Sequence, residues 1–99
     1  LLTAEHFPAE RALALGLVNE IVPEDELAER ATDWARRITA NAPLAVQATK
    51  ESVIRGLSVS LEEAYAIETE LSRKVFQSDD AKEGPKAFAE KRSPRWTGR

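Results

Sequence analysis

Hydrophobic positions recur at helical spacing along most of the chain, and this recurrence predicts a mainly α-helical structure. Within residues 27–38 the spacings are four, three, one and three, which gathers the apolar side chains on one face of a helix. That face comprises Leu27, Ala31, Trp34, Ala35 and Ile38. Residues 61–76 carry a second such face, formed by Ala64, Ile67, Leu71 and Val75 and widened by Leu61, Tyr65 and Phe76. Helices this short need tertiary contacts, because isolated ones are marginal in water.

Glycine and proline mark where other helices should end. Residues 8–15 are rich in helix-forming residues and stop at Gly16, which can adopt the left-handed conformation of a helix cap. Pro43 ends the 27–38 helix, because a proline disfavours helical geometry in the residue before it. A further helix is predicted over residues 43–55. We expect it to bury Val46, Val53 and Ile54.

The starts of helices carry acidic and hydroxyl residues. Pro23 is followed by Glu24, Asp25 and Glu26, and negative charge in a first turn is favoured by the helix dipole. Ser60 and Glu63 have the spacing of a capping box. Asp79 could cap a last helix that contains Phe88, but Pro85 removes a backbone donor there, so we expect a break or kink.

The remaining segments predict little regular structure. Residues 17–22 contain β-branched positions in partial alternation, so at most one short extended segment is expected near residues 18–22. Six residues cannot form a sheet alone. Residues 93–99 should be an irregular tail. The chain is therefore interpreted as one helical segment, residues 1–99.

Composition excludes several classes of protein. A net charge of −3 argues against a general nucleic-acid binder, which would need a basic surface. No apolar run approaches the length of a membrane span. The absence of cysteine excludes disulfides and thiolate chemistry, and it fits a cytoplasmic protein. The chain starts at Leu1 and contains no methionine, so we expect that upstream sequence precedes it.

Few residues are candidates for chemistry. His6 is the single histidine and has no neighbouring ligands or nucleophile, so a surface or packing role is favoured over a metal or catalytic one. Acidic pairs at helix starts could act as acid and base, but dipole stabilisation explains their positions. Tyr65 lies on an apolar face and is interpreted as core. We assign no catalytic and no metal-binding residue.

One pair near the end of the chain has a sharper interpretation. Phe88 and Lys91 are three residues apart, so on a helix they would share a face. An aromatic ring beside an ammonium group could stack on a base while the cation meets a phosphate. The spacing alone is common and does not identify a ligand.

The order of motifs resembles the C-terminal third of the enoyl-CoA hydratase/isomerase (crotonase) family. Residues 1–3, Ala12 and residues 16–23 resemble the family's "LLTG…A…GLVN.VVP" stretch, although Ala4 stands where the family often has glycine. Residues 42–50 resemble its "PPLAVRATK" helix start. Residues 79–92 and 94–98 resemble its "S.DA.EG..AF.EKR" ending and "P.F.G" tail. The match covers the whole chain in order.

The resemblance implies the helical C-terminal part of a crotonase-like fold, with the N-terminal catalytic domain absent from this chain. In that family the missing domain supplies an oxyanion hole and the acid–base residues, so the 99 residues alone should be inactive. The parent enzyme would process acyl-CoA without a tightly bound cofactor, most simply by adding water to a 2,3-enoyl-CoA. The alternatives are isomerase or other crotonase chemistry, or a non-catalytic helical interaction module.

The resemblance also implies two roles for residues within the chain. Phe88 and Lys91 match family positions that contact the adenine and phosphate end of CoA. The helices match the part of the family that builds a trimer, often packed as a dimer of trimers. Such assembly would cover the broad apolar faces described above.

Overall fold

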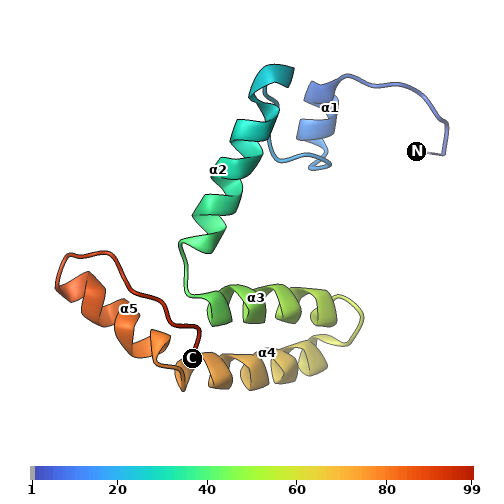
Figure 1. Ribbon diagram of the computed structural model, residues 1–99. Helices are drawn as coiled ribbons and strands as arrows, with labels where there is room; N and C mark the ends of the chain where they lie inside the picture. Colours follow the sequence, from blue (N-terminus) through green and yellow to red (C-terminus); the bar gives the residue numbers. More distant parts are fainter. Residues whose placement is uncertain (1) are drawn as a thin grey trace. The chain divides into compact units, whose positions relative to one another are not determined.

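The computed structural model describes residues 2–99 and consists of helices joined by short loops (Figure 1). In chain order these are α1 (Ala9–Ala14), the 3-10 helix η1 (Glu24–Glu26), α2 (Leu27–Thr39), α3 (Pro43–Gly56), α4 (Leu61–Phe76) and α5 (Asp80–Ala89). No strand forms within residues 2–99. The mainly α prediction is therefore confirmed. The chain divides into two compact units, Leu1–Trp34 and Ala35–Arg99, which are described separately.

In the first unit, α1 ends at a glycine as predicted. Gly16 has φ +70°, its N–H donates to the Leu13 carbonyl at 3.0 Å, and the Leu17 N–H donates to the Ala12 carbonyl at 2.9 Å. These two bonds define a Schellman motif, which satisfies carbonyls at the helix end. Ala4 also has a positive φ, +53°, which gives a physical reason why glycine would suit that position.

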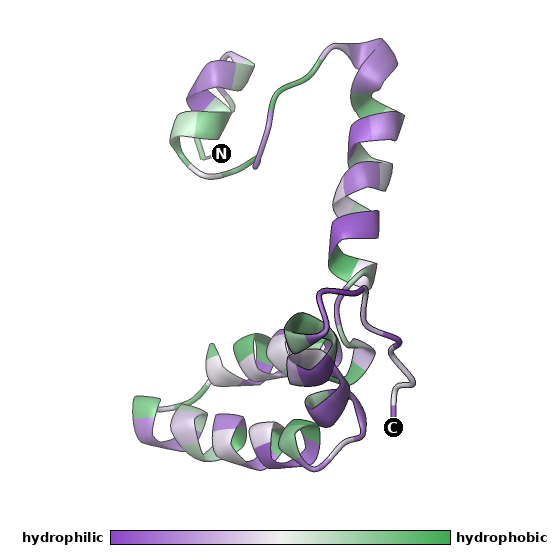
Figure 2. Ribbon diagram, turned by 90° about the vertical axis from the view of Figure 1, so that its left-hand side faces the viewer, coloured by the Kyte–Doolittle hydropathy of each residue, from purple (hydrophilic) through white to green (hydrophobic). Residues whose placement is uncertain are grey.

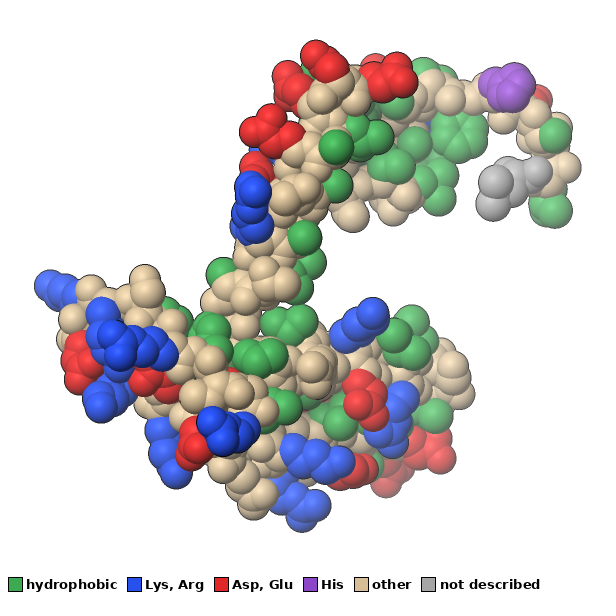
Figure 3. Space-filling model, in the orientation of Figure 1, with side chains coloured by type: hydrophobic (Ala, Val, Ile, Leu, Met, Phe, Trp, Pro, Cys, Tyr) green, Lys and Arg blue, Asp and Glu red, His purple; other side chains and the backbone are tan. Residues whose placement is uncertain are grey.

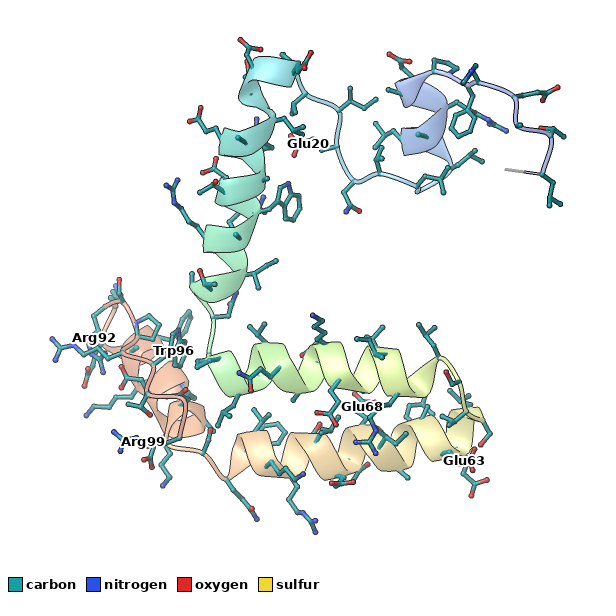
Figure 4. All side chains as sticks on the ribbon, turned by 45° about the vertical axis from the view of Figure 1, so that its right-hand side comes forward. Glu20, Glu63, Glu68, Arg92, Trp96 and Arg99 are labelled. Carbon is teal, nitrogen blue, oxygen red and sulfur yellow. The ribbon has the colours of Figure 1, made fainter. Side chains whose placement is uncertain are left out.

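Residues 18–22 form no strand and are held instead by side chains on α2. Glu20 accepts a hydrogen bond from Trp34 Nε1 at 3.0 Å, and its other oxygen lies 3.2 Å from Arg30 Nε (Figure 4). The acidic turn after Pro23 is the 3-10 helix η1, and α2 follows it directly. The expected amphipathic helix is thus present.

In the second unit, α3 and α4 form a helical hairpin. They lie side by side, joined by residues 57–60, and hydrophobic and hydrophilic positions alternate along both (Figure 2). Ser60 begins α4 with the predicted capping box. Its Oγ accepts from the Glu63 N–H at 3.2 Å, and Glu63 Oε2 accepts from the Ser60 N–H at 3.0 Å.

The predicted apolar face of α4 supplies part of a small core. Leu71 is 5% exposed and Ala87 of α5 is 1% exposed; within residues 2–99 these are the buried hydrophobic residues. The other members of the α4 face are half-buried: Ala64, Ile67 and Val75. A hairpin with one neighbouring helix buries only the side chains along the lines of contact between its helices.

The expected burial on α3 and α4 is partly wrong for this chain. Val53 and Ile54 are each 58% exposed, and Val46 is half-buried. Tyr65, interpreted as a core residue, is exposed as well. The reason is that α3 packs against α4 on one side, and no described element of the second unit covers its other faces.

The break expected at Pro85 does not occur. α5 runs without interruption from Asp80 to Ala89, although Pro85 cannot donate to the carbonyl four residues earlier. Contacts on both sides of the proline hold the helix together: Gly84 lies against the indole of Trp96, and Ala87 is buried.

Candidate functional site

The two residues matched to a CoA contact lie where α5 ends. Phe88 is in the last turn of the helix and is 87% exposed, and Lys91 is exposed two residues beyond the final helical residue. The expected shared helix face is wrong, because the chain leaves the helix between them. Both nevertheless belong to one short segment, residues 88–92, called here the α5 corner.

Lys91 adopts a backbone conformation that lysine rarely takes. Its φ is +52°, its N–H donates to the Phe88 carbonyl at 3.2 Å, and the Arg92 N–H donates to the Ala87 carbonyl at 3.0 Å. This is the same Schellman motif that ends α1, with lysine in the place of Gly16. The left-handed region costs an L-residue about 1 kcal/mol or more, so the helix end is strained at Lys91.

Arg92 is locked by hydrogen bonds around its guanidinium group. Nη1 and Nη2 donate to the two carboxylate oxygens of Glu83 at 2.6 and 3.0 Å. Nε donates to Glu90 Oε2 at 2.5 Å, and Nη1 also reaches the Ser93 carbonyl at 3.1 Å. The paired bonds to Glu83 have the bidentate geometry that fits a guanidinium to a carboxylate. Figure 4 shows Arg92 at the end of α5.

Glu83 holds two partners at once. Besides Arg92, its Oε1 accepts a hydrogen bond from the Arg95 N–H at 2.7 Å. The hydrogen bonds from the Arg92 side chain, followed by that from the Arg95 N–H, lower the pKa of Glu83 from 4.5 to about 2. Glu83 is consequently an anion at neutral pH, and it connects the middle of α5 to the chain beyond the α5 corner.

The Lys91 ammonium is uncommitted by comparison. Within residues 2–99 it forms no ion pair and no side-chain hydrogen bond, whereas its neighbour Arg92 meets two carboxylates. Charged side chains crowd the α5 end of the second unit (Figure 3). Of the two adjacent cations at the α5 corner, Lys91 is therefore the one whose side chain has no partner within residues 2–99.

Asp80 ties the C-terminal segment to α5, a role that the amino-acid sequence did not indicate. It is 3% exposed at the start of α5, where its Oδ1 accepts from the Thr97 N–H at 2.7 Å and from the Thr97 hydroxyl at 3.1 Å. Its Oδ2 accepts from the Gly98 N–H at 2.9 Å. The bond from the Thr97 N–H is the largest cause of a lowered pKa at Asp80. The irregular segment 93–99 is thus tied to α5.

The side chain that caps α5 belongs to Ser78 and not to Asp79, the residue predicted to cap it. Asp79 occupies the N-cap position but makes no side-chain cap hydrogen bond. Ser78 performs that role, since its Oγ accepts from the Ala81 N–H at 3.2 Å. The Asp79 backbone N–H donates to the Arg99 carbonyl at 2.6 Å, which adds a further tie to the 93–99 segment.

Trp96 joins the 93–99 segment to the turn between α2 and α3. Its Nε1 donates to the Ala40 carbonyl at 2.8 Å, and a Cβ placed on Gly84 would lie 3.4 Å from its Cη2 atom. Figure 4 shows the side chain next to α5 and close to the first turn of α3. Gly98, at φ +71°, approaches Pro43 at a similar distance, 3.4 Å from an added Cβ. Residues far apart in sequence therefore meet around α5.

The structure brings the other candidates into no metal or acid–base group within residues 2–99. His6 is exposed, and no group of three or more potential ligands for a metal ion occurs among residues 2–99. The first-turn residues Glu62 and Glu63 lie at the start of α4 as the dipole interpretation predicts. None of the helices within the described part of the chain is long and apolar enough to cross a membrane.

An open groove of about 430 Å³ runs between α3 and α4. Its lining is mostly small or apolar, with Val53, Leu71, Val75 and Phe76 among its residues, and it also includes Glu68. Hydrophobic side chains also lie open on the surface of the hairpin (Figure 3). The second unit consequently exposes apolar surface that a folded protein usually covers.

Known proteins match the chain along its whole length but extend well beyond it. Enoyl-CoA hydratase EchA19 of Mycobacterium tuberculosis is 46% identical over 99 residues, covering 100% of this chain and 37% of that protein. Carnitinyl-CoA dehydratase of Salmonella arizonae is 42% identical over 102 residues, covering 99% of this chain and 39% of that protein. The chain thus spans well under half the length of these relatives.

The fold agrees with the sequence match. The crystal structure of enoyl-CoA hydratase from M. tuberculosis H37Rv superposes with a TM-score of 0.92 at 46% identity, covering 99% of this chain and 39% of that one. The sequence pattern of the enoyl-CoA hydratase/isomerase family matches residues 1–99, which confirms the resemblance seen in the motifs. This chain belongs to the enoyl-CoA hydratase/isomerase family.

Proposed function

We propose that these residues are the C-terminal helical part of an enzyme that adds water across the 2,3-double bond of an enoyl-CoA. The observation that carries this is that the whole of this chain matches part of enoyl-CoA hydratases in both sequence and fold. The named dehydratase relative fits the same chemistry, because dehydration of a 3-hydroxyacyl thioester is the reverse reaction. We assign no catalytic residue within this chain, and we propose that the acid–base groups lie in the part of the relatives that it does not span.

The full-length protein is expected to hydrate crotonyl-CoA, whereas with the 99-residue chain alone the hydration should proceed only at the uncatalysed rate. The reason is that stabilising the enolate needs an oxyanion hole, which we propose lies outside this helical part. Loss of absorbance from the conjugated thioester measures the reaction. Shifting the double bond of a 3-enoyl-CoA without hydrating crotonyl-CoA would favour an isomerase. Hydration by the chain alone would contradict the division of roles.

For the residues within the chain, we propose that the α5 corner contacts the nucleotide end of CoA. The exposed Phe88 ring can stack on adenine, a contact worth about 1–3 kcal/mol for a base on an aromatic side chain. The uncommitted Lys91 ammonium can bind the 3′-phosphate through a charge-assisted hydrogen bond. The neighbouring Arg92 is already engaged with Glu83 and Glu90.

Lys91→Ala in the full-length protein should weaken CoA binding roughly tenfold while changing dephospho-CoA binding little. One hydrogen bond to a charged group contributes about 1.5 kcal/mol, which corresponds to that factor. Isothermal titration of both ligands measures it. Lys86→Ala, which removes an exposed lysine from α5 a short distance before Lys91, serves as the control and should alter neither affinity. Equal weakening of both ligands would rule out a 3′-phosphate contact at Lys91.

We also propose that the hairpin α3–α4 assembles with copies of the same protein, as a trimer or a dimer of trimers. Its exposed apolar side chains and the open groove between its helices support this. A second copy would remove that surface from water, at roughly 25 cal/mol for each Å² of apolar area.

A further inference from the structure

The α5 corner contains two adjacent cations that the structure treats in opposite ways. Arg92 has donors bonded to Glu83, Glu90 and the Ser93 carbonyl. Lys91 has no side-chain partner within residues 2–99, and it has the strained backbone. A guanidinium with four of its five N–H donors already engaged has little capacity left for a phosphate. The two cations therefore differ in role as well as in position.

We propose that Glu83 is a positioning residue, which holds Arg92 and the Arg95 N–H so that Lys91 presents its ammonium to the CoA phosphate. This inference rests on the proposed contact between Lys91 and the 3′-phosphate. Glu83 itself need not touch the ligand. Glu83 fixes the residues that follow Lys91, mainly through its hydrogen bonds to the Arg92 side chain.

The geometry shows why Lys91 needs such a clamp. On its N-terminal side, α5 holds the turn through the two bonds of the Schellman motif. On its C-terminal side, Glu83 holds it twice, at the Arg92 side chain and at the Arg95 backbone. Without the second hold, the left-handed residue would relax toward ordinary backbone regions, which point the side chain elsewhere. A rigid base also reduces the conformational freedom that the lysine loses on binding.

A comparison within the chain supports a use for the lysine side chain. The equivalent position at the end of α1 is Gly16, which adopts the left-handed conformation without strain. α5 ends in the same motif but has a lysine there. Strain that the surrounding structure maintains is a recognised sign of a functional position. An uncommitted ammonium on a strained, clamped backbone is the pattern expected of a pre-organised anion contact.

The test compares CoA and dephospho-CoA affinities in the full-length protein, because their ratio isolates the 3′-phosphate. Glu83→Gln should lower the ratio about fivefold, as expected when a supporting group is coupled to a binding residue. In a Lys91→Ala background the same substitution should change the ratio no further. Glu51→Gln is the matched control: it breaks an exposed Glu–Arg pair of 2.8 Å on α3 and should leave the ratio unchanged.

Each outcome separates the two proposals. If Lys91→Ala lowers the ratio but Glu83→Gln does not, the positioning role is wrong and the Lys91 contact stands. If neither changes it, both are wrong. If the two effects add in the double variant, Glu83 acts independently of Lys91, which also overturns the inference. Should Glu83→Gln fail to fold, Arg92→Lys gives the test, since lysine lacks the fork that grips both oxygens. An unchanged ratio there would contradict the proposal.

Discussion

Replacing Asp80 by asparagine in the full-length protein is expected to lower its melting temperature by several degrees and to open the 93–99 segment to trypsin at Arg95. The Asp80 carboxylate accepts three hydrogen bonds from Thr97 and Gly98 in a site that is almost closed to water. An asparagine of the same shape would turn an NH₂ group toward one of these donors. A buried donor without an acceptor carries a substantial desolvation penalty.

Asp79→Asn is the matched control for Asp80→Asn. Asp79 is the adjacent aspartate, but its side chain is exposed and lies 3.9 Å from Lys82. Exposed ion pairs contribute little, so this variant should keep both the melting temperature and the resistance to trypsin. Equal behaviour of the two variants would contradict a specific tie between Asp80 and the 93–99 segment.

The Asp80 tie also has an expected pH dependence. The pKa of Asp80 is lowered below 3.8, and that of Glu83 falls from 4.5 to about 2. A carboxylate whose pKa is lower in the folded state adds stability above its unfolded pKa, and this is lost as the pH falls through the folded value. Protection of the 93–99 segment, cut next to Trp96 by an acid-active protease, should therefore weaken below about pH 4.5, and Asp80→Asn should reduce that dependence.

Leu57→Asp should reduce the solution mass of the full-length protein from that of a trimer or hexamer to that of one chain. Leu57 lies in the loop between α3 and α4 and is 82% exposed in this chain. If copies of the protein cover it, an aspartate there would place an unpaired charge in an apolar interface, and such a charge is strongly unfavourable. Sedimentation measures the mass, and circular dichroism checks that the helices persist.

Ser58→Asp is the control for Leu57→Asp, because it adds the same charge at the neighbouring exposed position. It should retain the assembly. If Leu57→Asp keeps the parental mass, this loop is not part of the interface. If the variant loses its helices, the surface is covered by the same chain instead of by another copy. Either result would overturn the proposed assembly surface.

Local signals in the sequence were sufficient for most of the helices. The α4 helix begins at the Ser60–Glu63 capping box, and α1 ends at Gly16, as predicted. These features could be predicted because each depends on residues within about one helical turn of each other. The apolar stripe of α4 likewise identified Leu71, since helical periodicity alone places it on the packed face.

The tertiary structure alone decided how the candidate site is held. Asp80 looked like one more acidic residue at a helix start, yet its partners Thr97 and Gly98 lie 17 and 18 residues further on. The same holds for Glu83, which meets Arg92 nine residues away.

The tertiary structure also decided which apolar side chains are buried. Val53 is apolar at a helical position but stays exposed, because burial requires a neighbour that no described helix of the second unit supplies. The sequence by itself therefore determined the helices, their caps and the family. The folded chain decided which charges pair across α5, since pairing over a distance depends on how the segments are brought together and on no local preference.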